Sequence, residues 1–287
     1  MSQPPAGIPG ARQQPPLLRQ RWQTINPAHA IQRAAVVLTF PEEIPSFVVM
    51  RVVEALRPFA LGAGLLKEEA LNSMLIQIGP GGAQNTTPTS QTGSAFQDVR
   101  NGQVAQALKI TKEAIRFEIA EYTRWVALRD QLEKIFSLSF PILEQSTTVQ
   151  SIGLEYVDFF FAVAEGEEDA GLIIDNQSQL IARRAFRKRE PFHSHSGWFE
   201  RETAQSRFLV NVDLSVADAL GPIGQRRAIT VRTFEAEQII DSLSDRAKEM
   251  VQVDKVLTGL DAIHASLKER LSNLLTREAR TMISLGT

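Results

Sequence analysis

The sequence predicts an α+β fold of two similar halves, each running strand, helix, antiparallel strands and long helix, with the helices packed on an antiparallel sheet. The first observation behind this prediction is a change of hydrophobic period within residues 114–140. Ile115, Phe117 and Ile119 alternate with other residues, which is typical of a half-buried strand. After Tyr122 the apolar residues follow the spacing of one helical face, at Trp125, Leu128, Leu132, Ile135 and Phe136.

The second observation is that the same order of patterns returns near the C-terminus. Every second residue from Phe208 to Val216 is apolar, and a strand at Arg227–Phe234 follows a turn that contains Gly and Pro. A long helix with a leucine-rich stripe is predicted from about Leu257 to Ile283. We therefore expect a first half at 29–146 and a second half at 147–287, behind a flexible Pro- and Gln-rich arm at 1–28. No residue-by-residue repeat relates the two halves.

Proline and glycine mark the boundaries of the other elements in the first half. Pro45 suits the first turn of a helix, where a missing N–H is tolerated. The polar, glycine-rich stretch 79–94 is too long for a tight hairpin and is predicted to be a loop. In chain order the elements are a buried strand at Ala35–Phe40, a helix at Ser46–Ala60, a strand at Ser73–Ile78, the loop, and short strands at Ala95–Val99 and Val104–Ile110.

The second half opens on a very apolar segment, Ile152–Val163, which predicts a central strand covered on both faces. Glu155 and Asp158 interrupt it, and a carboxylate there is unfavourable unless it is paired or lies at an edge. Residues three apart in a strand point to opposite faces, so these two are not expected to act as a catalytic pair. We favour pairing with an arginine, and a functional site is the alternative. A short helix is predicted next, at Asp175–Phe186.

Composition limits the classes of function. The 287 residues are 43% hydrophobic and 22% charged, as in an ordinary globular protein. The formal net charge is −2, so the overall charge does not favour binding to nucleic acid or to an anionic membrane. No cysteine is present, which excludes disulfides and thiolate chemistry and suits a reducing cytoplasm, the localisation we expect. No apolar run reaches the roughly 20 residues that span a bilayer, and no secretory signal is recognised, so no membrane partner is expected.

The sequence contains no motif with an established catalytic mechanism: neither a phosphate-binding loop, nor a metalloprotease helix, nor a nucleophile elbow is found. We therefore expect no catalytic residue, no cofactor and no metal site. The nearest approach to a metal site is His193 and His195, whose imidazoles would lie on one side of an extended segment. Because a third ligand is missing, an exposed polar loop is favoured there. His29 and His264 are predicted to lie on the surface or on a helix, without partners.

The strongest local charge feature is a basic run, and it is the candidate contact for an anion or a partner. If it is helical, Arg183 shares a face with Arg187. The run could hold the phosphates of a nucleic acid or an acidic protein, and a solvated, salt-bridged face is the other interpretation. Its members are Arg183, Arg184, Arg187, Lys188 and Arg189.

Four short segments form an ordered set of motifs. They are Ala35–Phe40, the strand-to-helix segment with Tyr122 and Trp125, Gly153-Leu154-Glu155-Tyr156-Val157-Asp158, and Leu260-Asp261-Ala262-Ile263-His264. Over about residues 30–285 the chain resembles, in these segments, a sporadically distributed bacterial protein family of unassigned function. That family has Arg and Asn where this chain has Glu155 and Asp158. The resemblance implies a soluble bacterial protein that works beside other gene products.

Together these observations favour a non-catalytic interaction or assembly protein of a bacterial cytoplasmic system, acting through a protein partner or by self-association. One alternative is a nucleic-acid-binding protein that uses the basic run Arg183–Arg189. The other is a metal-assisted hydrolase that uses His193 and His195.

Trp125 is predicted to be a packing residue that fixes the junction between strand and helix. Replacing it in Trp125→Ala should therefore lower the free energy of unfolding by about 3 kcal/mol, the loss typical of a large core side chain. Urea denaturation measures this loss. A fully stable Trp125→Ala protein without biological activity would instead place Trp125 on a functional surface.

Overall fold

The computed structural model describes residues 17–26, 28–78, 84–164, 168–182, 191–221 and 224–285. Up to residue 143 its elements are α1 (Leu17–Arg21), β1 (Trp22–Thr24), β2 (Ile31–Thr39), α2 (Ser46–Gly62), β3 (Lys67–Ile78), β4 (Gln84–Arg100), β5 (Gln103–Thr111), β6 (Ala114–Ile119) and α3 (Trp125–Leu143). The remaining elements are β7 (Ser151–Ala162), the 3-10 helix η1 (Ala170–Leu172), β8 (Phe192–Glu200), β9 (Ser206–Gly221), β10 (Gly224–Ile239), α4 (Asp245–Glu249), α5 (Val253–Leu274) and α6 (Arg277–Met282).

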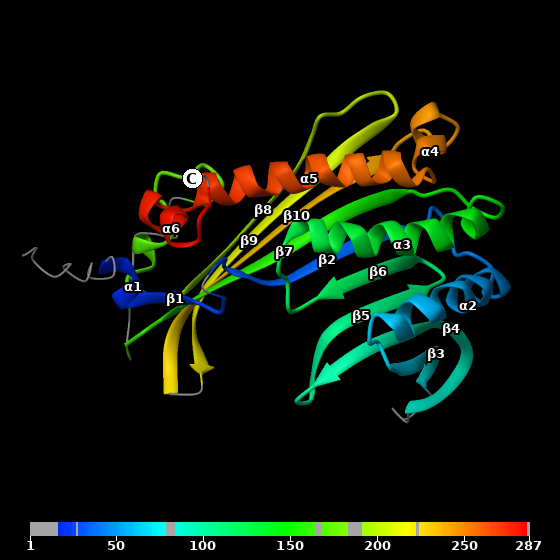
Figure 1. Ribbon diagram of the computed structural model, residues 1–287, viewed down its shortest axis with the longest axis horizontal. Helices are drawn as coiled ribbons and strands as arrows, with labels where there is room; N and C mark the ends of the chain where they lie inside the picture. The colour runs from blue at the N-terminus through cyan, green and yellow to red at the C-terminus, as the bar shows by residue number, and fades with distance from the viewer. Residues whose placement is uncertain are drawn as a thin grey trace, which may run out of the picture.

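The strands form one large antiparallel sheet, so the α+β class is confirmed (Figure 1). Nine of the ten strands follow the order β3-β4-β5-β6-β2-β7-β10-β9-β8, and β1 pairs with β7 off this path. Strands β2–β6 thus occupy one side of the sheet and β7–β10 the other. The first long strand of each side, β2 or β7, lies at the centre, where the two pair antiparallel. β7 therefore joins the two sides.

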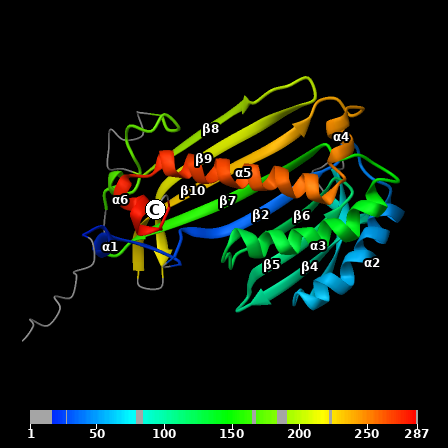
Figure 2. The same cartoon turned by 45° about the horizontal axis from the view of Figure 1, so that its top comes forward.

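The long helices cover one face of the sheet, as Figures 1 and 2 both show. α2 packs on β4 and β5, α5 packs on β7 and β10, and α3 lies between α2 and α5. Their apolar stripes face inward: in α3, for example, Leu128, Leu132 and Ile135 are buried. None of the described helices is long and apolar enough to cross a membrane.

Two apolar clusters lie under these helices. One joins α2 and α3 to the first side of the sheet and to the beginning of β7, and the other joins α1, α6 and the end of α5 to the second side. The two ends of the described chain meet in the second cluster, where α1 lies beside α6 (Figure 1) and the Arg19 guanidinium donates to the Met282 carbonyl at 3.0 Å. Residues 17–26 are therefore folded, with Trp22 completely buried, although the arm was expected to reach residue 28.

Several element predictions are wrong for identifiable physical reasons. The loop expected at 79–94 is strand from Gln84 on, and the threonines of that stretch have a strong preference for strands. The helix expected at Asp175–Phe186 is absent from its described part, residues 175–182, where side chains of Asp175 and Ser178 accept backbone N–H groups and form turns. The exposed loop expected at His193 and His195 is strand β8.

The long C-terminal helix is broken in two. Leu275 is extended and forms a β-bridge with Ile174, which interrupts the helix after α5. Thr276 then caps α6, because its hydroxyl accepts the Ala279 N–H at 3.2 Å. The break turns the chain so that Ile283 returns to the sheet and α5.

On the face that the long helices leave uncovered, Glu155 is enclosed by three arginines. Its carboxylate is buried and accepts hydrogen bonds from Arg33 at 3.1 Å, from Arg116 at 3.4 Å and from Arg232 at 2.7 Å. The arginines come from β2, β6 and β10, so this carboxylate links three strands across the centre of the sheet. The predicted pairing with arginine is confirmed for Glu155.

Removing this carboxylate should destabilise the sheet. Glu155→Gln keeps the shape but leaves three guanidinium groups without a counter-charge, and we expect the free energy of unfolding to fall by about 1–3 kcal/mol. The value stays moderate because the arginines reach solvent, with 42%, 29% and 50% of the side chain exposed. Urea denaturation measures it, with Glu133→Gln on the exposed side of α3 as the matched control. Equal stability of the two variants would contradict this role of Glu155.

Candidate functional site

A cavity of about 250 Å³ lies between the centre of the sheet, the beginning of α3 and the C-terminal half of α5. It sits where the two apolar clusters meet, because Tyr122 and Tyr156 belong to one cluster and Leu271 and Ile283 to the other. We call it the Asp158 pocket. Its polar and aromatic lining consists chiefly of His29, Tyr122, Trp125, Tyr156, Asp158 and His264.

Asp158 is the unusual member of this set. It is 1% exposed, and neither of its carboxylate oxygens has a hydrogen-bond partner among the residues that the structure describes. The other buried carboxylates of those residues, Glu155, Glu235 and Glu237, each pair with at least one arginine. The predicted pairing is therefore wrong for Asp158. A buried carboxylate without a partner is destabilising, which makes Asp158 the centre of the candidate site.

A β-bulge in the neighbouring strand shapes the backbone beside Asp158. Ile31 of β2 pairs with Asp158, whereas Arg33 pairs with Val157, so β2 has one more residue than β7 at this point. The bulge lets Ile31 line the pocket while Arg33, two residues later, reaches Glu155 on the opposite face. In a regular strand these two side chains would point the same way.

Five rings line the pocket in an unbroken series. The ring centroids of successive members lie 5.5 Å apart for His29 and Tyr122, 5.6 Å for Tyr122 and Tyr156, and 5.8 Å for Tyr156 and His264. The series ends on Trp125, which stacks on His264 with centroids 4.7 Å apart. The Tyr156 hydroxyl and Nδ1 of His264 also share a hydrogen bond of 2.9 Å. The rings come from four separate segments, so their series holds sheet and helices together around the pocket.

Trp125 also joins α3 to α5 directly. Its Nε1–H donates to Oδ1 of Asp261 at 2.6 Å, and Nε of Arg129 lies 3.2 Å from both oxygens of the same carboxylate. Trp125 is half-buried and packs against the first apolar cluster. It is thus a packing residue at the junction and a wall of the pocket at the same time.

Burial sets the protonation states in the pocket. It raises the pKa of Asp158 from 3.8 to about 7. Burial, aided by the charge of Lys268, lowers the pKa of His264 from 6.5 to about 4, and burial also lowers the pKa of His29. Both imidazoles are therefore neutral at pH 7, and neither supplies the positive charge that an ionised Asp158 lacks.

Positive charge is present instead at the mouth of the pocket. Arg124 and Lys268 line it, both are exposed, and neither forms an ion pair within the described part of the chain. α3 begins at the same place, and no side chain caps its first turn, so the positive end of the helix dipole faces this region. The Asp158 pocket is therefore bipolar, with a carboxylate inside and cations outside.

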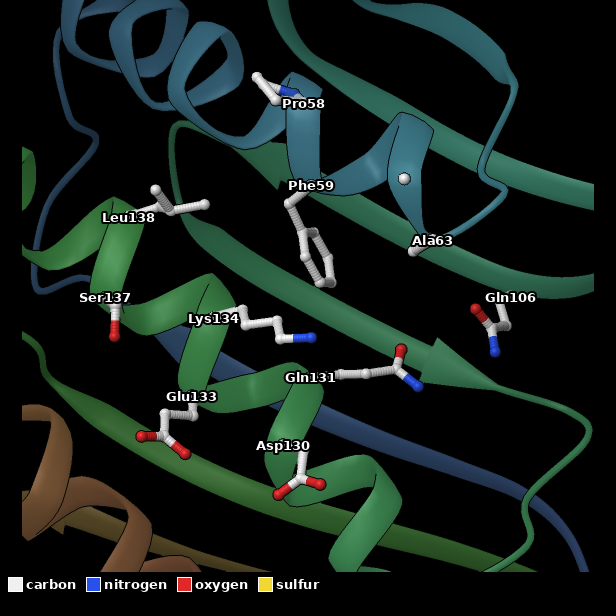
Figure 3. Close-up of a pocket in the computed structure, with 11 residues that line it drawn as sticks. Pro58, Phe59, Ala63, Gln106, Asp130, Gln131, Glu133, Lys134, Ser137 and Leu138 are labelled. Carbon is white, nitrogen blue, oxygen red and sulfur yellow. The ribbon is translucent and has the colours of Figure 1, made fainter.

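A larger and shallower hollow lies elsewhere, between the end of α2 and the outer side of α3 (Figure 3). Its volume is about 1090 Å³, and Phe59 points into it. Its charged residues Asp130, Glu133 and Lys134 are all exposed to solvent. Solvated side chains of this kind need no ligand, so we take the smaller Asp158 pocket as the candidate site.

The candidate site residues from the sequence analysis lie in different places, and some of them lie outside the described residues. The basic run Arg183, Arg184, Arg187, Lys188 and Arg189 lies outside the described residues. His193 and His195 do project from the same side of β8, where His195 pairs with Asp213. Within the described ranges, no three His, Asp or Glu side chains come together as a metal site would require.

Two pocket residues, His29 and His264, were predicted to be surface or helix positions without partners. His264 does lie on helix α5, but the expected lack of partners is wrong. His264 is hydrogen-bonded and stacked in the ring series, and His29 begins that series. A signal was present in the motifs. Three different segments of the ordered set supply pocket residues, namely Tyr122 with Trp125, Tyr156, and His264.

No family model matches the chain, and no curated protein matches it.

Asp158 should make the protein less stable as the pH rises. Its pKa is higher in the folded than in the unfolded chain, so the folded state holds the extra proton and unfolding is favoured progressively from about pH 4 to pH 7. Asp158→Asn removes this effect. We expect the variant to gain stability over the parent, by up to about 4 kcal/mol above pH 7 and by little near pH 4. Urea denaturation across this pH range measures the gain, and a pH-independent difference would contradict it.

Proposed function

We propose that the protein is a non-catalytic binding protein that recognises its ligand through the Asp158 pocket. One observation carries this proposal: the pocket holds a fully buried carboxylate whose oxygens have no partner among the described residues, although other buried carboxylates are paired with arginine. An arrangement that lowers stability is retained where binding requires it. The occupant of the pocket would supply the missing partner.

The contacts within the pocket favour binding over catalysis. A catalytic nucleophile or base is normally oriented by a hydrogen bond from a second group. Asp158 has no such bond in the described residues, and the bond between Tyr156 and His264 does not include it. Acid–base catalysis by Asp158 is the second candidate, favoured by a pKa of about 7 that suits proton transfer at neutral pH.

We further propose that the protein works with other components of a bacterial cytoplasm, through a protein partner or by self-association, and that ligand binding controls this association. The pocket supports this idea because its wall joins α3, α5 and the chain after α6, so an occupant could shift how these segments pack. Duplication of one ancestral half is also part of the proposal. The strand order supports it, because β2 and β7 each begin one side of the sheet and meet at its centre.

The test is to purify tagged protein gently from its native cells and to identify co-purifying small molecules and proteins by mass spectrometry. We expect the parent protein and the control Glu133→Gln to carry the same molecule, and Asp158→Asn to carry at least tenfold less of it, because the carboxylate that holds the ligand is gone.

Equal recovery from all three proteins, or nothing specific from any of them, would contradict the proposal. The same preparation separates the two candidates: a ligand that is recovered unchanged after prolonged incubation supports binding, and its conversion into a product supports acid–base catalysis.

A further inference from the structure

We propose that the Asp158 pocket binds a small zwitterion, with the amino group of the ligand against Asp158 and its acidic group against Arg124 and Lys268 at the mouth. This inference rests on the proposed function, because it names the class of ligand for the same pocket. Four features of the described residues lead to it: the unpartnered carboxylate inside, the wall of rings, the charges at the mouth and the volume.

The inside of the pocket requires a ligand with N–H donors and a positive charge. Both oxygens of Asp158 lack partners among the described residues, and burial alone shifts its pKa. A protonated amine has three N–H donors and carries the counter-charge of a carboxylate. A neutral ligand could bind only the protonated acid, because it would leave an ionised Asp158 uncompensated, whereas an amine binds the carboxylate itself.

The wall of the pocket also suits a cation. Tyr122, Tyr156 and Trp125 present their rings to the cavity, and a cation near the face of such a ring is attracted by its quadrupole. Asp158 is also buried, which strengthens its attraction to an ammonium group. Carboxylate and rings therefore favour the same kind of group.

The positive charges at the mouth of the pocket favour a zwitterion over a simple amine. Arg124 and Lys268 are exposed and without ion pairs in the described residues, and the uncapped first turn of α3 adds partial positive charge. These charges would repel a ligand that is only cationic. A carboxylate or phosphate on the outer end of the ligand turns the repulsion into an attraction. Opposite charges at the two ends of the pocket thus select a ligand with opposite charges at its two ends.

The volume limits the size of the zwitterion. Sites for drug-sized ligands measure about 300–1,000 Å³. The Asp158 pocket, at about 250 Å³, is smaller, so the ligand has the dimensions of a free amino acid or a similar aminocarboxylate.

Binding should depend on pH because the amine needs an ionised Asp158. With a pKa of about 7, roughly a tenth of Asp158 is ionised at pH 6 and roughly nine-tenths at pH 8. The other titratable or charged groups that face it are His29 before β2, Tyr122 and Arg124 before α3, Tyr156 on β7, and His264 and Lys268 on α5. Burial raises the pKa of both tyrosines and lowers the pKa of both histidines, so Asp158 dominates this interval.

Isothermal titration calorimetry tests the inference with the common α-amino acids and with unbranched ω-amino acids from glycine to 6-aminohexanoate. Each ω-amino acid is compared with the alkylamine and the carboxylic acid of the same length. We expect at least one amino acid to bind at least tenfold more tightly than either of its matched single-charge compounds, and about tenfold more tightly at pH 8 than at pH 6.

Three variants accompany the titration. Asp158→Asn should abolish binding, Arg124→Ala combined with Lys268→Ala should bring the affinities of amino acid and amine together, and Glu133→Gln should bind like the parent protein. The double variant changes only exposed side chains, so its effect does not depend on the stability of the fold.

Binding that survives Asp158→Asn, equal affinities for amino acid and amine in the parent protein, or no binding by any compound would overturn the inference. If the molecule carried from native cells still depends on Asp158 in any of these cases, the proposed function stands and only the zwitterion is excluded. If that dependence is also absent, both proposals fail.

Discussion

The structure depends on one constraint: strand β7 lies at the centre of the sheet, is buried along most of its length, and carries a carboxylate on each of its faces. β7 pairs with β2 on one side and with β10 on the other, so it cannot leave the centre of the sheet. Glu155 faces three arginines on the open face, which neutralise it and link three strands. Asp158 faces the helices, where nothing described neutralises it. The same strand is thus stabilised on one face and strained electrostatically on the other.

This asymmetry explains how the surrounding elements are arranged. Because of the bulge in β2, Ile31 lines the pocket and Arg33 reaches Glu155. Two side chains that are two residues apart therefore lie on opposite faces of the sheet. The break between α5 and α6 brings the chain after α6 back to the pocket, where an uninterrupted helix would have continued away from it. The cavity also lies where the two apolar clusters meet. The bulge in β2 and the break between α5 and α6 therefore each bring residues to the wall of the pocket.

Periodicity predicted much of the fold because it reports local structure. The strand-to-helix segment around Tyr122 and the central strand at Ile152–Val163 were recognised in this way. The first part of strand β4 was not recognised, because it is polar and has no apolar alternation. The helix break at Leu275 was not recognised either, because it depends on a bridge to Ile174. The candidate site was harder to predict from the sequence than the fold. Opposite faces for the two carboxylates followed from strand geometry, but which of them meets arginine depends on the register and bulge of β2.

Among the described residues of the ligand-free protein, the Asp158 carboxylate has no partner. Carbon-detected NMR measures the titration of its carboxyl carbon directly, with the signal assigned by its loss in Asp158→Asn. The structure predicts a midpoint near pH 7 in the ligand-free protein, because burial alone acts on this group. A midpoint near pH 4, the ordinary value for an aspartate, would show that the carboxylate is already solvated or paired and would contradict the account.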